Sequence, residues 1–241
     1  MNINDLEEKI RQSESMSLSA AFPILMRKVY LWMAMALAIS GLTAYSVAAS
    51  PGLVQLIYSN SLVMWGCIIA ELVMVWKISN SVAKENRSLA TTTLMFIIFS
   101  ALNGVTLSSI FVLFAPAAIV KTFVITAGTF GVMAAYGYFT SRDLTKIGGL
   151  LFMALIGVII ASVVNMFLHS SGLDLVVSII GVLVFVGLTA WDSQQIKMSL
   201  AMAPDLGETS QKLAVTGALS LYLDFVNLFL YLLRFFGGSR D

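Results

Sequence analysis

The chain contains seven apolar runs of about 20 residues each, separated by short polar connections. A helix needs roughly 20 residues, at about 1.5 Å of rise per residue, to cross the roughly 30 Å of hydrocarbon in a bilayer. The pattern therefore predicts an all-α membrane protein built as a seven-transmembrane-helix bundle. The predicted spans are 29–49, 61–78, 89–114, 119–139, 147–168, 175–196 and 213–236.

Composition excludes a water-soluble domain. Of the 241 residues, 59% are hydrophobic and only 11% are charged, whereas soluble domains carry roughly 25% charged residues. The 14 basic and 13 acidic residues nearly cancel, so no overall field favours nucleic acid as a partner. A single cysteine, Cys67, forms neither an internal disulfide nor a metal cluster. We expect no cofactor and no resident metal.

The first 28 residues are polar and include eight charged residues. A signal peptide would have a short basic region followed directly by an apolar core, which this segment lacks. We therefore expect no cleavage, a polar cytoplasmic tail over 1–28 that is mobile or lies on the membrane surface, a transmembrane domain over 29–237 and a short C-terminal tail over 238–241.

Basic residues near the span ends gather on one side of the predicted membrane. They lie in the N-terminal segment and in the second, fourth and sixth connections, while the other connections have almost none. Cytoplasmic loops carry the excess of Lys and Arg. We therefore expect a cytoplasmic N-terminus and, because the number of spans is odd, a C-terminus outside.

Four ionisable residues lie within the predicted spans at membrane depth: Glu71, Asp192, Asp224 and Arg234. A charge at this depth costs at least about 2.5 kcal/mol on insertion scales, so each is a functional candidate. Glu71 and Arg234, each otherwise unpaired, are predicted to stabilise one another. Two further cations lie near span ends and are expected to be interfacial anchors, namely Lys77 and Lys121.

The seventh span carries a stripe of polar residues on one helical face. They follow one another at spacings of three or four residues, as Ser220, Asp224, Asn227, Tyr231 and Arg234. This pattern predicts that the seventh helix stands inside the bundle. Ser220 and Asn227 either face an ion path or only bond neighbouring helices, whereas a buried carboxyl group such as Asp224 must be neutralised or paired.

The sixth span brings a second aspartate to the same side of the membrane. Consecutive antiparallel helices allow Asp192 to approach Asp224, although Asp224 is expected to lie deeper. Glycines within the spans are expected to permit close helix packing. They include Gly104, Gly128, Gly131, Gly137, Gly148 and Gly149.

Several segments resemble the Bax inhibitor-1 family, also called transmembrane Bax inhibitor motif proteins. The strongest likeness is ALSLYLDFVNLF over 218–229, continuing through 232–237, which resembles the last helix of that family. WDSQQI over 191–196 resembles its penultimate helix, and YGYFT over 136–140 its central loop. NGVTLS over 103–108 fits its third helix. The short loops are similar to those of the bacterial branch.

The resemblance implies a central seventh helix and a calcium-permeable leak governed by pH. It assigns the proton sensor to Asp192 and Asp224, and it assigns supporting roles to Glu71 and Arg234. The basic latch of the family has no clear match among Lys77, Lys84 and Arg87. The resemblance also places the protein in a bacterial inner membrane, where members are associated with a membrane-bound ATP-dependent protease.

Three functions remain to be compared. An ion leak would use paired carboxylates as oxygen ligands for calcium as the permeant ion. A non-transporting partner of a membrane protease would act through helix faces. An intramembrane aspartyl protease also has two facing aspartates, but its Gly-x-Gly-Asp sequence is absent around Asp224. The acid in the last span also disfavours a retinal protein, which needs a Schiff-base lysine there.

The positive charge bias makes the topology testable. A reporter fused after Asp241 should be active only outside the cytoplasm, and one inserted near Arg142 only inside, because basic loops stay cytoplasmic. Paired fusions of a periplasmic and a cytoplasmic reporter enzyme at each position measure this. Labelling of both positions from the same side would contradict a seven-span chain.

Overall fold

The computed structural model describes residues 3–84, 87–203 and 205–236, with side chains from Ala21 onward. Within these ranges the chain is helical and has seven helical stretches long and apolar enough to cross a membrane. The elements are α1 (Ile3–Ala48), α2 (Pro51–Tyr58), α3 (Ser61–Ser79), α4 (Leu89–Leu107), α5 (Ser109–Leu113), α6 (Pro116–Phe139), α7 (Thr145–Leu168), α8 (Ser171–Ala201) and α9 (Glu208–Phe236).

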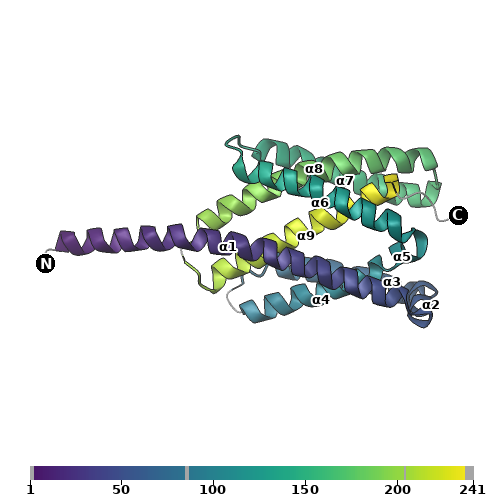
Figure 1. The fold of residues 1–241 in the computed structure, drawn as a ribbon, viewed down its shortest axis with the longest axis horizontal. Coiled ribbons are helices and arrows are strands. Elements are labelled where there is room, and N and C mark those ends of the chain that lie inside the picture. Colours follow the sequence, from purple (N-terminus) through teal and green to yellow (C-terminus); the bar gives the residue numbers. More distant parts are fainter. Residues whose placement is uncertain (1–2, 85–86, 204, 237–241) are drawn as a thin grey trace.

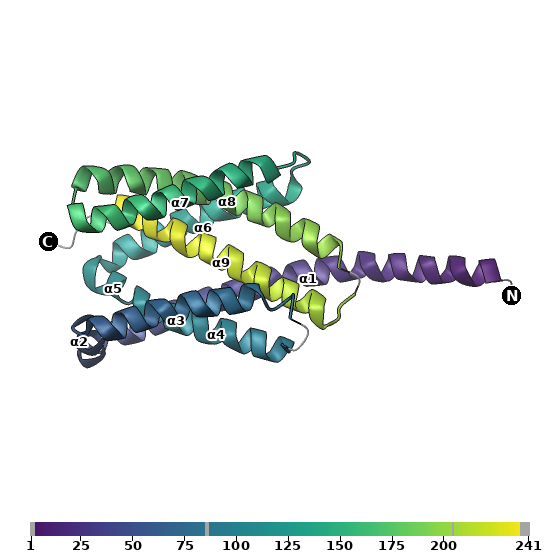
Figure 2. The same ribbon diagram turned by 180° about the vertical axis from the view of Figure 1, so that it is seen from behind.

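Helix α9 lies at the centre of the bundle, as predicted. It runs obliquely between α6 and α8 on one side and α1, α3 and α4 on the other (Figures 1 and 2), and it packs against all five. Its burial exceeds that of the other spans, with 61% of its apolar window inside the protein. The seven-helix bundle with a central C-terminal helix is therefore confirmed.

The N-terminal segment is helical and continues directly into the first span. Helix α1 begins at Ile3 and continues without a break through Pro23 to Ala48, and its first half extends beyond the bundle (Figure 1). The first apolar span starts at Ala21, eight residues before the predicted start. Because α1 is continuous, the segment leaves the bundle along the axis of the first span. The C-terminal tail, 238–241, lies outside the described residues.

The third predicted span is interrupted rather than continuous. Helix α4 ends at Leu107 and α5 begins at Ser109. At the break, the Tyr58 hydroxyl of α2 accepts a hydrogen bond from the Ser109 backbone N–H at 2.8 Å and contacts Ser108 Oγ at 3.0 Å. Backbone N–H and C=O groups that lose their helical hydrogen bonds inside a membrane need other partners. The Tyr58 side chain, from a neighbouring helix, therefore supplies a hydrogen-bond partner at the break between α4 and α5.

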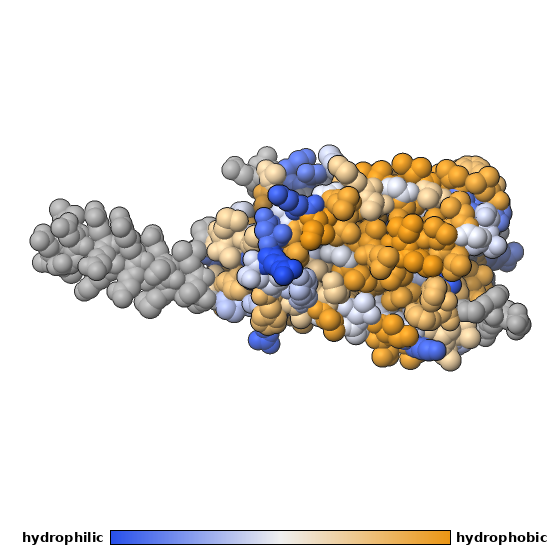
Figure 3. All heavy atoms as spheres, turned by 90° about the horizontal axis from the view of Figure 1, so that it is seen from above, coloured by the Kyte–Doolittle hydropathy of each residue, from blue (hydrophilic) through white to orange (hydrophobic). Residues whose placement is uncertain are grey.

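The outer surface has the polarity of a protein embedded in lipid. A broad apolar band covers the middle of the bundle, with polar residues toward its two ends (Figure 3). Helices α3 and α7 contribute most of their apolar side chains to this surface, since only 6% and 11% of their spans are buried. Lys77 and Lys121 are exposed near the ends of α3 and α6.

Some of the glycines permit close packing and others do not. A Cβ atom at Gly137 of α6 would lie 2.0 Å from the carbonyl oxygen of Ala190 in α8, and one at Gly148 would meet the Trp191 ring at 2.2 Å. Gly104 is equally tight, since its Cβ would lie 2.6 Å from the Ser40 carbonyl oxygen. By contrast, Gly128, Gly131 and Gly149 have open space within 4 Å.

Gly137 and Gly128 form a matched pair on α6. Gly137→Ala should destabilise the protein by about 1–3 kcal/mol, because the new methyl group overlaps backbone of α8. Gly128→Ala should be neutral or stabilise by up to about 1 kcal/mol, since alanine favours the helix and meets nothing. Thermal unfolding in detergent measures both. Equal midpoints for the two variants would contradict the close approach of α6 and α8.

Candidate functional site: a carboxyl pair between two helices

The side chains of Asp192 in α8 and Asp224 in α9 face each other, with their carboxyl groups within hydrogen-bonding reach. Asp224 is 4% exposed, and Asp192 is partly buried. Among the described residues, no N–H or O–H group donates to the buried Asp224 Oδ2. An ionised carboxylate only accepts hydrogen bonds, so two facing carboxyl groups bond to each other only when one is protonated. The pair can therefore hold a proton between two helices.

The helix ends explain how two aspartates at different depths meet. Helix α8 continues to Ala201, beyond the predicted end at 196, and α9 begins at Glu208, before the predicted start at 213. Helix α9 then crosses the bundle obliquely (Figure 1). Because of this oblique course, Asp224 reaches the level of Asp192 although it lies farther from the start of its helix.

The α8 side of the pair is held in place by its neighbours. Ser193 Oγ donates to the carbonyl oxygen of Ala134 in α6 at 2.8 Å. Gln194 Oε1 accepts from the backbone N–H of Leu144, ahead of α7, at 2.9 Å. Asp192 thus lies on a segment whose next two residues are bonded to α6 and to the loop before α7.

A cavity of about 140 Å³ separates α8 from α9 beside the pair. Asp192 and Gln195 line it from α8, and Thr216 and Ser220 from α9. Thr216 Oγ1 is buried without a hydrogen-bond partner, and Ser199, which also lines the cavity, is exposed near the end of α8. Polar groups therefore extend from the exposed end of α8 to the carboxyl pair.

Beyond the pair, α8 and α9 are packed together by a tyrosine. The ring of Tyr231 stacks on Phe185 with centroids 5.8 Å apart, and a Cβ at Gly181 would overlap that ring at 2.7 Å. Asn227 turns back on its own helix and donates to the Leu223 carbonyl at 2.8 Å. The polar cavity is thus closed on this side by aromatic packing.

Glu71 belongs to a second polar cluster, on the opposite side of α9. Its carboxylate accepts hydrogen bonds from Asn103 Nδ2 at 3.0 Å and Thr106 Oγ1 at 2.9 Å. The Tyr222 hydroxyl donates to Asn103 Oδ1 at 2.8 Å and contacts Ser40 Oγ at 2.7 Å. Ser40 Oγ also donates to the carbonyl oxygen of Ser100 in α4 at 2.7 Å. A hydrogen-bond network therefore connects α1, α9 and α4 and ends at Glu71 on α3.

The predicted pairing of Glu71 with Arg234 is wrong. Arg234 Nη1 instead lies 3.7 Å from Asp174 Oδ1, and both side chains are about half exposed, at 48% and 50%. Asp174 is in the first turn of α8 and Arg234 in the last turn of α9. The prediction failed for two reasons. Arg234 lies at the exposed end of the bundle, and the Glu71 carboxylate is hydrogen-bonded by neutral donors instead of a cation.

The basic candidates for a latch contact the end of α3. The Lys84 ammonium lies 5.7 Å from the centroid of the Trp76 ring, and Arg87 donates to the backbone carbonyl of Lys77. Lys212, in contrast, is 3% exposed and donates to the Arg87 carbonyl at 3.0 Å. These contacts join the loop before α4 to the start of α9.

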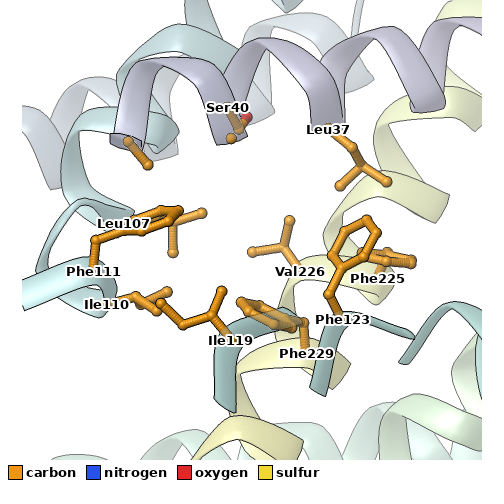
Figure 4. Close-up of a pocket in the computed structure, with 12 residues that line it drawn as sticks. Leu37, Ser40, Leu107, Ile110, Phe111, Ile119, Phe123, Phe225, Val226 and Phe229 are labelled. Carbon is orange, nitrogen blue, oxygen red and sulfur yellow. The ribbon is translucent and has the colours of Figure 1, made fainter. Parts of the chain in front are cut away.

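An apolar pocket of about 110 Å³ lies on the face of α9 that turns away from Asp192. Figure 4 shows aromatic and aliphatic side chains around it, with Phe225, Val226 and Phe229 contributed by α9. Ser40 is the one hydroxyl-bearing residue in its lining. This pocket has no group that could bind a cation, but it adjoins the α9 segment that carries Asp224.

Sequence reasoning missed the bonding roles of Ser40 and Tyr222. Asn103 offered a usable signal, because an amide in an apolar run needs a partner on another helix. No comparable signal marked Ser40 or Tyr222, since serine can bond its own helix and tyrosine is common in membrane spans. Their contribution depends on how four helices meet.

These features define a multi-pass helical membrane protein with an intramembrane carboxyl pair. The family described as "Inhibitor of apoptosis-promoting Bax1" matches residues 23–241, and the chain belongs to this family. It is 47% identical over 217 residues to the inner membrane protein YbhL of Escherichia coli, covering 89% of this chain and 92% of YbhL. It is also 41% identical over 216 residues to the uncharacterized protein RP147 of Rickettsia prowazekii, covering 90% of each chain.

The Tyr222 cluster can be tested by removing one hydroxyl. Tyr222→Phe should lower stability by about 1–3 kcal/mol, because the partly buried Asn103 Oδ1 loses its donor. Tyr136→Phe is the matched control, since Tyr136 lies exposed on α6. Thermal unfolding of both variants in detergent gives the comparison. A Tyr222→Phe midpoint equal to that of the control would show that the hydroxyl is not bonded.

Proposed function

We propose that this protein is a pH-sensitive, calcium-permeable leak channel of the bacterial inner membrane, gated by Asp192 and Asp224. The observation that carries the proposal is the facing of these two carboxyl groups, one of which, Asp192, lines a cavity that also has hydroxyl and amide groups in its lining. The inner-membrane location rests on the likeness to YbhL and on the seven candidate spans. The chain acts as a conduit and not as an enzyme.

The gating argument starts from the proton that the pair can share. With one proton, the carboxyl groups are joined by a hydrogen bond and titrate as a unit. When pH rises and this proton is lost, the bond is replaced by repulsion between two like charges in a poorly solvated place. Because α8 is bonded to its neighbours through Ser193 and Gln194, the repulsion acts mainly on α9.

The apolar pocket behind α9 gives this helix space to move. Val226 is two residues beyond Asp224 and therefore lies on nearly the opposite face of the helix. It lines the pocket of about 110 Å³ shown in Figure 4. A shift of α9 toward that pocket would separate Tyr231 from Gly181 and Phe185, which close the cavity beyond the pair. Deprotonation thus favours an open path.

The same residues suit calcium as the permeant ion. Calcium prefers oxygen ligands from carboxylates, backbone and amide carbonyl groups, and water. The ionised pair supplies two carboxylates, and Ser220, Thr216 and Gln195 supply neutral oxygens along the cavity. Protons and calcium ions would then compete for one pair of residues. On the other side of α9, Glu71 adds a carboxylate whose described partners are neutral donors.

Calcium flux into liposomes that contain only this protein tests the proposal. Wild-type flux should rise as pH increases through roughly 6 to 8, as the pair loses its proton. Asp192→Asn and Asp224→Asn should each flatten this dependence, because an amide keeps a hydrogen bond but cannot ionise. An encapsulated calcium-sensitive dye reports the rate.

Asp174→Asn is the matched control on α8, since Asp174 is about half exposed at the end of the bundle. Its pH curve should match the wild type. Absence of wild-type flux at every pH would refute the leak and leave a non-transporting partner of a membrane-bound ATP-dependent protease as the explanation. Wild-type pH curves in both aspartate variants, with folding intact, would refute the sensor.

A further inference from the structure

A groove of about 480 Å³ runs along the outside of the bundle between α1 and α6. Both helices pack on α8 and α9, and they contact each other where the Phe22 ring of α1 stacks on Tyr138 of α6, with centroids 6.3 Å apart. Its floor is made of small or buried residues of α6, including Gly131 and Ala134, and its sides of aromatic rings, including Tyr30 and Tyr138. The lining is apolar except for Arg27.

Arg27 lies within the first two turns of the first apolar span, which begins at Ala21, at the same end of the bundle as the last turn of α6. Its side chain is exposed, and the single ion pair among the described side chains joins Arg234 to Asp174. Arg27 therefore has no carboxylate partner there. A second cation lies nearby, since Lys197 Nζ donates to the Tyr138 carbonyl at 2.7 Å and is 5.4 Å from the Tyr138 ring centroid.

The depth of the groove corresponds to one leaflet of a bilayer. Along α6 it extends from Phe130 to Phe139, which is about 14 Å at the helical rise of about 1.5 Å per residue. Half of the roughly 30 Å hydrocarbon layer is about 15 Å. A chain lying in the groove would thus enter the hydrocarbon beside a guanidinium group at the headgroup level.

We propose that this groove is a binding site for one anionic phospholipid of the leaflet into which Arg27 projects. An acyl chain lies between α1 and α6, over Gly131 and Ala134, and the phosphate lies against the Arg27 guanidinium. A guanidinium offers paired N–H donors that match phosphate oxygens. Zwitterionic lipids can make the same acyl-chain contact, but the cation in their headgroup offsets the phosphate charge. The net negative charge of the headgroup therefore provides the selectivity.

Competition between two lipids tests the site. The purified full-length protein is mixed with equal amounts of phosphatidylglycerol and phosphatidylcholine, and bound lipid is identified by native mass spectrometry. The wild type should retain phosphatidylglycerol preferentially. Arg27→Gln should reduce that preference about fivefold, the value of one basic residue near an anionic surface. Arg27→Lys should retain part of it, because the charge remains and the paired donors are lost.

Two further variants separate this site from general charge effects. Arg142→Gln removes an exposed cation outside the groove lining and should leave the preference unchanged. Gly131→Leu should reduce binding of both lipids, because a Cβ there meets nothing within 4 Å and the longer side chain occupies the groove. This variant keeps Arg27 and therefore tests the groove even if Arg27→Gln fails to fold.

Three results would overturn the proposal. The first is equal retention of the two lipids by the wild type. The second is an equal loss of preference in Arg27→Gln and Arg142→Gln, which indicates diffuse attraction to the surface. The third is full displacement of phosphatidylglycerol by inorganic phosphate at the same concentration, which indicates a simple anion site without the acyl contact.

Discussion

The buried carboxyl group of Asp224 places the strictest demand on this fold. In hydrocarbon a carboxyl group needs a hydrogen-bonding partner, and no polar solvent is available to supply one. Asp224 finds its counterpart in Asp192 on α8. Helix α9 must therefore run inside the bundle, and the remaining helices surround it. The apolar exteriors of α3 and α7 follow, because these helices separate the polar interior from lipid.

Helix α9 has polar groups on two opposite faces, and they connect different parts of the bundle. Tyr222 and Asp224 are two residues apart and so point in nearly opposite directions. Tyr222 joins α9 to α1 and α4 through Ser40 and Asn103, and Asp224 faces α8. A movement of α9 that changes the carboxyl pair would also strain the cluster around Glu71. The two polar regions are therefore mechanically linked through one helix.

Unfilled volume is distributed unevenly around the carboxyl pair. Around Asp192, close glycine contacts and the bonds of Ser193 and Gln194 join α8 to α6 and to the loop before α7. On the other side, α9 borders an apolar pocket with unfilled volume. Packed interiors resist deformation, whereas unfilled volume permits small shifts. In the proposed mechanism, this asymmetry favours a displacement of α9 over one of α8.

The sequence by itself determined the number of spans, the central place of the last helix and the buried character of Asp192 and Asp224. Length and hydropathy fix a crossing helix, and a polar stripe at helical spacing fixes which face turns inward. Only the tertiary structure decided which groups meet. Arg234 pairs with Asp174 instead of Glu71, and Glu71 is bonded by Asn103 and Thr106. Partner choice depends on helix tilt, depth and rotation, which arise from packing between helices and leave no local trace in the sequence.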